Sequence, residues 1–199
     1  MSEPTRDIID ALAGIRAGSA LDAVRAKRST ARDNAQRAYE LLLHPTAPGD
    51  VDLDERRAVA AFVALLHRDE AIARHYVDLL DGQDMRCAVE AEAREAAVEG
   101  PYGSYPPGPL SGEDTVGPLY RVGEEAHAQL GARLAAALEH AHLLVFHPRD
   151  TKSEALGRLV AAGWSADGIV TLSQLVSFLA FQIRAAIGLR ALAQAGEAA

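Results

Sequence analysis

Cysteine is almost absent from this 199-residue chain, which contains Cys87 alone. A single cysteine excludes an internal disulfide and a metal site built only from cysteines. Lysine is also scarce, with 2 residues against 18 arginines, and the net charge is −8. Because no basic tail or stripe is present, we expect neither nucleic acid nor an anionic membrane to be a main partner.

Long hydrophobic runs are also missing. The longest uncharged apolar stretch, Ile169 to Ile183, has 15 residues, whereas a helix needs about 20 residues to cross a bilayer. The first seven residues are polar and acidic, and they lack the charged and apolar regions of a secretion signal. These observations predict a cytoplasmic protein without a membrane span.

Alanine and leucine, by contrast, are abundant. The chain has 40 Ala and 24 Leu, both of which favour helices, and aromatic residues make up 5 %. No segment shows the period-2 alternation, bounded by turn residues, that is typical of strands. We therefore expect an all-α fold.

The expected helices form two halves separated by a loop rich in Pro and Gly. An N-terminal helical extension covers residues 1–50, and a first half covers 51–99, with helices at 69–80 and 84–98. In 100–118, Pro and Gly supply ten of 19 residues, so no helix can cross this segment. The segment is either a solvated connector or a functional loop.

The second half, 119–199, begins with an expected helix over 124–146. After it, the pattern Thr151-Lys152-Ser153-Glu154 predicts a capping box, and Ser165 is placed to cap the following helix. That helix, over about 166–187, is apolar around most of its circumference. Such a helix must be buried on several sides, so we expect either a central core helix or the main subunit interface.

The first candidate site lies around His75. On a continuous helix, Arg68, Ala71 and His75 would be spaced i, i+3, i+7 and share a face, and Glu55 lies 13 residues before Arg68. A buried histidine beside a carboxylate and an arginine is a candidate acid–base site, because small changes of environment move its charge across neutral pH. The alternative is a mesh of solvated charges on a helix surface.

Two further candidates are less specific. Gln182 and Arg184 end the long apolar run, and since buried polar groups need partners, we expect them to line a cleft or an interface. Cys87 is either a lone reactive thiol, activated by a neighbour such as Arg86, or a small buried apolar residue.

Three histidines, His140, His142 and His147, form the last cluster. His140 and His147 are seven residues apart and would share a helical face, while His142 would point elsewhere. Chelation on a helix needs pairs at i, i+3 or i, i+4, which this cluster does not offer. We therefore expect neither a metal nor a cofactor.

Parts of both halves resemble the carboxymuconolactone decarboxylase (CMD) and alkylhydroperoxidase D-like (AhpD-like) superfamily. The residues that carry the resemblance are His147-Pro148-Arg149-Asp150, Ala162-Gly163-Trp164-Ser165 and the run Ser173–Arg184. They are similar to the C-terminal half of peroxidase-related members and closest to an uncharacterised subfamily, "CMD domain protein", that lacks the Cys-x-x-Cys motif. The resemblance covers roughly 130–192 and, more loosely, 53–80. It implies an AhpD-like helical domain with an extra N-terminal helical segment, and a homo-oligomer, commonly a dimer, trimer or hexamer.

The alkylhydroperoxidase branch carries a glutamate followed 13 residues later by Cys-x-x-Cys-x-x-x-His. Glu55 and His75 match this pattern, but Arg68 and Ala71 occupy the two cysteine positions. One thiol must attack the peroxide and a second must resolve the sulfenic acid, so these positions do not support that chemistry. The decarboxylase branch has an arginine seven residues before a histidine, which Arg68 and His75 resemble.

Three functions follow from the resemblance. The first is a cofactor-independent enzyme of decarboxylase or isomerase type for a small carboxylated or lactone-like metabolite. In that enzyme Arg68 would bind the anion, His75 would move a proton and Glu55 would orient the histidine. The second is a peroxidase-related antioxidant protein that uses Cys87 or a partner's thiol. The third is a non-catalytic subunit that pairs with a catalytic CMD homologue.

Overall fold

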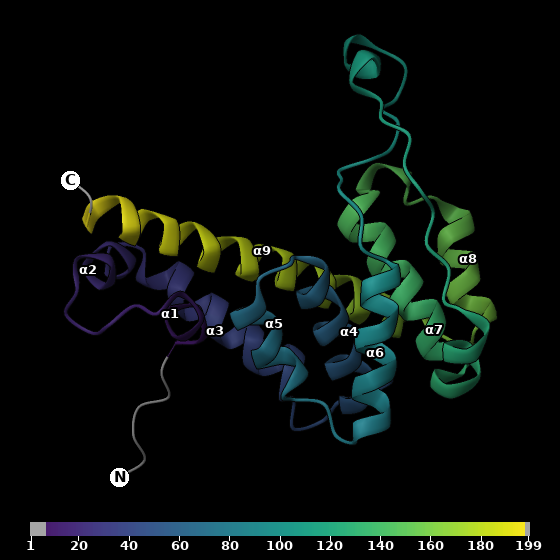
Figure 1. Cartoon of the computed structure of the whole chain (residues 1–199), viewed down its shortest axis with the longest axis horizontal. Coiled ribbons are helices and arrows are strands. Elements are labelled where there is room, and N and C mark those ends of the chain that lie inside the picture. Colours follow the sequence, from purple (N-terminus) through teal and green to yellow (C-terminus); the bar gives the residue numbers. More distant parts are fainter. Residues whose placement is uncertain (1–6, 198–199) are drawn as a thin grey trace.

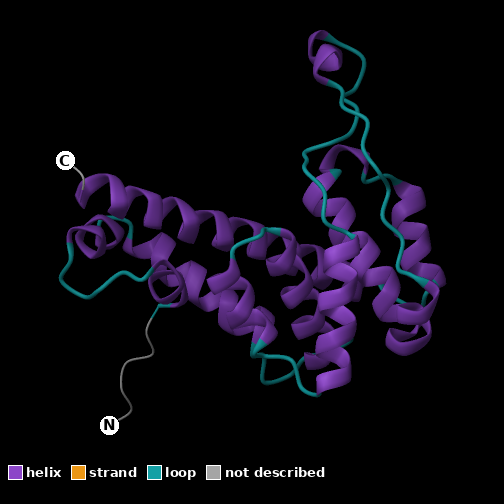
Figure 2. Ribbon diagram, in the orientation of Figure 1, coloured by secondary structure: helices purple, strands orange, loops and turns teal. Residues whose placement is uncertain are grey.

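The computed structural model describes residues 7–197, in which the long regular elements are all helices (Figures 1 and 2). This confirms the all-α prediction. The elements are α1 (Ile8–Ala13), α2 (Ala20–Ala26), α3 (Ser29–Leu43), α4 (Leu53–Leu66), α5 (Glu70–Val77), α6 (Gln83–Glu95), η1 (Pro109–Glu113), α7 (Glu124–Phe146), η2 (Pro148–Asp150), α8 (Ser153–Ala161) and α9 (Ala166–Glu197), where η marks a short 3-10 helix.

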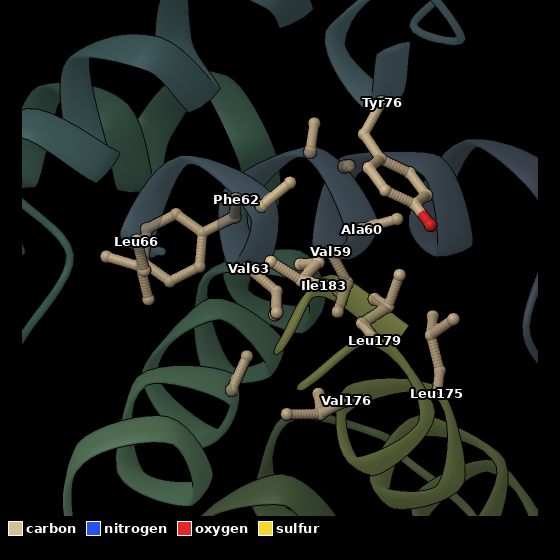
Figure 3. Close-up of a cluster of buried hydrophobic side chains, with 14 of the residues drawn as sticks. Val59, Ala60, Phe62, Val63, Leu66, Tyr76, Leu175, Val176, Leu179 and Ile183 are labelled. Atoms are coloured by element: carbon tan, nitrogen blue, oxygen red, sulfur yellow. The ribbon is translucent and has the colours of Figure 1, made fainter. Parts of the chain in front are cut away.

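Helix α4 lies at the centre of the core and packs against α5, α6, α7 and α9. Its many alanines let neighbouring helices approach closely, while larger residues such as Phe62 and Val63 fill the space between them (Figure 3). A capping box starts the helix. Asp52 Oδ1 accepts a hydrogen bond from the Glu55 backbone N–H at 2.8 Å, and Glu55 Oε2 accepts one from the Asp52 backbone N–H at 3.2 Å.

Helix α9 is ten residues longer than the predicted 166–187. Its C-terminal part runs along the N-terminal helices, where it packs against α1 and α3 (Figure 1). One side is buried, including Leu172, Leu179 and Ile183, whereas Val170 and Phe181 are more than half exposed. The expectation of burial on several sides is therefore wrong for a single chain, because the partners of α9 leave its other side uncovered.

By length and composition, α9 is also the one helix in residues 7–197 that is long and apolar enough to cross a membrane. In its most apolar window, 33 % of the residues are buried in this fold. A core helix of a soluble protein has the same composition.

The predicted continuous helix face through Arg68 and His75 is not formed. After α4 ends, Arg68 adopts a left-handed conformation with φ 57°, which is uncommon for a residue other than glycine, and the chain turns there. Asp69 then caps α5 by accepting the Ile72 N–H at 3.0 Å. Arg68 therefore lies outside the helix that carries His75, and they share no helical face.

Two other helix predictions need correction, while one is confirmed. Lys152 occupies the cap position of α8 without a side-chain cap bond, so the predicted capping box of Thr151 and Glu154 is absent. Helix α7 has the predicted bounds but is kinked at Gly131, where φ is 80° and ψ is 158°. Ser165 caps α9 as expected, accepting the Gly168 N–H at 3.0 Å.

Residues 100–118, called the arm below, extend away from the helices as a narrow loop with η1 at its tip (Figures 1 and 2). Near its base, Gly103 and Thr115 form an isolated antiparallel bridge, with N–H to O distances of 2.8 and 3.2 Å.

Candidate functional site

Three hydrogen-bonded side chains, which we call the relay, connect the end of α3 to α5. The Tyr39 hydroxyl lies 3.0 Å from His75 Nε2 and 3.2 Å from His44 Nε2. His44 is exposed, Tyr39 is buried and His75 is half-buried. A hydroxyl group can donate one hydrogen bond and can also accept hydrogen bonds. Tyr39 can therefore donate a hydrogen bond to one histidine while it accepts a hydrogen bond from the other. A proton taken up by His44 can therefore be passed to His75 by exchange along two hydrogen bonds.

The charge states of the relay suit proton transfer. Burial lowers the pKa of His75, and repulsion by His44 lowers it further, with Asp78 opposing both effects. At neutral pH, His75 is therefore uncharged and available as a base. Burial raises the pKa of Tyr39, so this residue keeps its proton and acts as a bridge.

On its inner side, His75 contacts a second polar pair. Its ring meets Tyr76 edge-on, with centroids 4.9 Å apart. Burial raises the pKa of Tyr76, whose side chain points from α5 toward α9 (Figure 3), where its hydroxyl donates to Gln182 Oε1. Gln182 is fully buried, and its Nε2 has no partner among the described residues. Unpaired buried donors are rare and costly, so Gln182 is a candidate contact for a bound molecule.

Glu55 lies at a different place. Arg133 of α7 donates to the Glu55 carboxylate from Nε at 2.6 Å and to the Gly163 carbonyl at 2.6 Å. The Arg133 guanidinium also lies 4.0 Å from the centre of the Trp164 ring. Glu55 thus joins the start of α4 to α7 and to the turn between α8 and α9, and no hydrogen bond links it to His75.

Arg68 lies beyond the opposite end of α4 from Glu55. The 11 residue steps from Glu55 to the end of α4 at Leu66, at 1.5 Å each, separate these two backbone positions by about 17 Å. Arg68 is half-exposed; it donates to the Val98 carbonyl at 3.1 Å and pairs with Glu99 at 3.3 Å. One chain therefore does not bring Glu55, Arg68 and His75 into a single site.

The remaining candidates, Arg184 and Cys87, lie at the surface. Arg184 is exposed on α9; burial lowers the pKa of His67, and the Arg184 charge lowers it further. Cys87 is exposed on α6, where Gln83 Nε2 lies 3.2 Å from its sulfur. The interpretation of Cys87 as a small buried residue is therefore wrong, and its thiol faces solvent.

The three C-terminal histidines are buried at separate positions. His140 Nε2 lies 3.4 Å from Ser173 Oγ, and His142 Nε2 donates to the Ala96 carbonyl at 3.1 Å. Burial lowers the pKa of His140 and of His142 to about 4. His147 follows the end of α7, so it does not share a helical face with His140. Within residues 7–197, no group of three or more His, Cys, Asp or Glu side chains could hold a metal ion.

A groove lies on the side of the molecule where α3, α8 and α9 meet. It has a volume of about 770 Å³ and a mainly apolar lining, formed by Ala38, Leu41, Leu42, Leu156, Ile169, Val170, Ser173, Gln174, Ser177 and Phe178. Leu41 and Val170 are 57 % and 56 % exposed.

Sequence reasoning missed Tyr39, His44 and Tyr76. Tyr39 and His44 are five residues apart, which is not a helical contact spacing, and only the packing of the folded chain brings them to His75. Comparison with known proteins adds no candidate. No family model, curated protein or solved structure matches this chain.

Proposed function

We propose that this chain is a CMD/AhpD-like helical protein without the redox cysteine pair, with an N-terminal helical extension. In this proposal it is a cofactor-independent enzyme of isomerase or decarboxylase type. The observation that carries the proposal is the Tyr39 hydroxyl, which bridges the exposed His44 and the half-buried His75. The proton path comes from this geometry, and the substrate class, a small carboxylated or lactone-like metabolite, comes from the sequence resemblance.

An uncharged His75 favours reactions that begin with removal of a proton. In an isomerisation, His75 takes a proton from the carbon beside a lactone carbonyl, and the electron pair of the broken C–H bond enters an enolate. The protonated His75 then returns the proton to another carbon of the conjugated system. Both steps use the same histidine, as expected for a base with a pKa below neutrality.

A decarboxylation uses the whole relay, because a proton must reach His75 from solvent. The C–C bond to the carboxylate breaks, CO2 leaves, and the electron pair enters the conjugated lactone. The ring carbon then needs a proton, which His44 takes from water and passes through Tyr39 to His75. The proposal assigns a substrate contact to Gln182, because its buried amide nitrogen is unpaired.

We also propose that the chain acts as a homo-oligomer. Apolar side chains around the groove of α3, α8 and α9 are widely exposed: Leu41 at 57 %, Val160 at 60 %, Val170 at 56 % and Phe181 at 55 %. Exposed apolar side chains gathered near one groove are typical of an interface. A second copy of the chain would cover the side of α9 that its own helices leave open.

The test is proton transfer to small carboxylated γ-lactones in D2O, followed by NMR for deuterium incorporation, isomerisation and CO2 loss. We expect His75→Gln to lower the rate at least 100-fold, because general acid–base catalysis contributes about 10²–10⁴-fold. Tyr39→Phe should lower it less, since His75 stays in place. Arg74→Gln, an exposed neighbour on α5, serves as the matched control and should leave the rate unchanged.

The alternative functions give different results. If the wild type reduces an organic hydroperoxide with a dithiol, and Cys87→Ser abolishes this reaction, the chain is a peroxidase. If it is inert alone and is isolated from its native source with a Cys-x-x-Cys homologue, it is a non-catalytic subunit. Either result would overturn the acid–base proposal.

A further inference from the structure

The base of the arm is attached to residues 146–150. The Tyr102 N–H donates to the Phe146 carbonyl at 2.6 Å, and the Ser104 N–H donates to Asp150 Oδ1 at 3.2 Å. Arg149 donates to the Gly103 carbonyl at 3.2 Å, and its guanidinium lies over the Tyr105 ring. The arm therefore leaves the body of the protein through a defined set of polar contacts.

His147 lies at the centre of this attachment and is 2 % exposed. Its Nε2 is 2.9 Å from the Pro118 carbonyl oxygen, and its Nδ1 is 3.1 Å from Asp150 Oδ2. A carbonyl and a carboxylate only accept hydrogen bonds, so each ring nitrogen must donate. A neutral imidazole has one N–H, and only the doubly protonated ring can make both bonds.

The surroundings of His147 identify which group changes charge. The Tyr102 ring lies 5.0 Å from it and the His142 ring 6.2 Å, and His142 is neutral because burial lowers its pKa to about 4. Burial raises the pKa of Asp150, but the hydrogen bonds from His147 and Ser104 and the positive charge of Lys152 lower it. The net effect is a lowered pKa, so the Asp150 carboxylate is ionised. The Arg149 guanidinium is a fixed donor. The imidazole of His147 is therefore the group of this attachment whose number of N–H donors can change, and both of its ring nitrogens face acceptors.

We propose that the proton on His147 is a latch at the base of the arm. The ring bonds Pro118 directly at one end, and it also holds Asp150, which accepts the hydrogen bond from the Ser104 N–H at the other end. When the ring releases this proton to water, one N–H remains. If it is on Nε2, the Pro118 bond survives and an unprotonated Nδ1 faces the carboxylate of Asp150. If it is on Nδ1, the Asp150 bond survives and the Pro118 end is released. In both cases the arm loosens as the pH rises.

The latch is separate from the relay, because no residue of one contacts a residue of the other in any described interaction. It controls how the arm presents two exposed apolar side chains, Leu110 (49 %) and Val116 (98 %), together with the adjoining Leu119 (67 %). With both ends attached, these side chains keep one orientation relative to the helices. When either attachment is weakened, they do not.

Hydrogen exchange of the Tyr102, Gly103 and Ser104 amides tests the latch. After correction for intrinsic exchange rates, we expect protection of these amides to fall at least tenfold across about pH 5–8, the range in which histidines change charge. His147→Gln should remove this pH dependence. His127→Gln, a change of an exposed histidine on α7, is the matched control and should keep it. Protection that is independent of pH in the wild type, or a step that persists in His147→Gln, would overturn the latch.

A second measurement needs no variant and so does not depend on how His147→Gln folds. Nitrogen-15 chemical shifts report directly whether each ring nitrogen of a histidine carries a proton. At pH 5, both nitrogens of His147 should be protonated, and one should lose its proton as the arm amides lose protection. A bare ring nitrogen at pH 5, or a proton loss unconnected with the exchange of the arm amides, would contradict the proposal.

Discussion

Replacement of Arg56 tests how the outer end of the relay is held. Arg56 lies on α4 and is 5 % exposed. Its guanidinium donates to three backbone carbonyls of the preceding segment: Leu42 at 2.9 Å, Pro48 at 2.8 Å and Val51 at 2.8 Å. This segment contains His44, so Arg56 fixes the backbone on both sides of the exposed relay histidine.

The cost of removing Arg56 follows from these bonds. Arg56→Met keeps most of the apolar stem but leaves three carbonyls without their donor. Each lost bond to a charged group is worth about 1.5–3 kcal/mol, partly offset because the buried charge no longer has to be desolvated. Burial indeed lowers the pKa of Arg56, with Glu55 and Asp52 opposing this. We expect a net loss of about 3–5 kcal/mol, which corresponds to a Tm lower by about 6–20 °C.

Urea unfolding and thermal melts followed by circular dichroism measure this loss. Arg57→Met is the matched control on the same helix, since Arg57 pairs at 2.5 Å with Asp81, whose side chain is 80 % exposed. Such a pair is worth at most about 1 kcal/mol. If Arg56→Met is no less stable than Arg57→Met, the three carbonyl bonds do not hold this segment, and the reasoning is refuted.

Three other predictions follow from the same structure. Gly117→Ala should loosen the base of the arm, because the added Cβ would overlap with the Tyr102 ring, and the Tyr102 amide should therefore exchange faster. Gly112→Ala is the control: a Cβ added at Gly112 meets no other atom, so the exchange of the Tyr102 amide should not change. Phe181→Glu should dissociate the proposed oligomer in light scattering, while Val24→Glu, a control at another exposed apolar residue, should not. The free energy of unfolding should fall as the pH drops from about 6.5 to 4, by on the order of 3 kcal/mol for each of His140 and His142. The reason is that these histidines bind protons in this pH range in the unfolded chain, whereas in the folded protein they stay neutral. His142→Phe should make this fall less steep in urea titrations, and a flat profile in the wild type would contradict the burial argument.

Helices with strong stop signals could be predicted well from the sequence. The helix over 124–146 has the predicted bounds because His147-Pro148 ends it. The end of α9 was missed because no Pro follows Arg184 and the alanine-rich tail continues the helix. Which side of α9 is covered depends on how α1 and α3 pack, and composition does not contain this information.

The candidate site was only partly predictable. His75 and Gln182 were selected by residue type, and the structure places both beside Tyr76. The left-handed turn at Arg68 has no local signal such as a glycine, so the helical spacing of Arg68 and His75 was misleading. Tyr39 reaches His75 across 36 residues, and spacing rules within one helix cannot predict such a contact.

The pH titration of His75 by NMR tests the central claim most directly. We expect His75 in the wild type to titrate below the ordinary pKa of histidine, because burial and the neighbouring His44 both disfavour its charged form. Tyr39→Phe, which keeps the ring but removes the bridging hydroxyl, should shift the titration of His75, because the hydrogen bond to its Nε2 is lost. If His75 titrates at the ordinary value and Tyr39→Phe leaves that titration unchanged, the relay does not exist in solution.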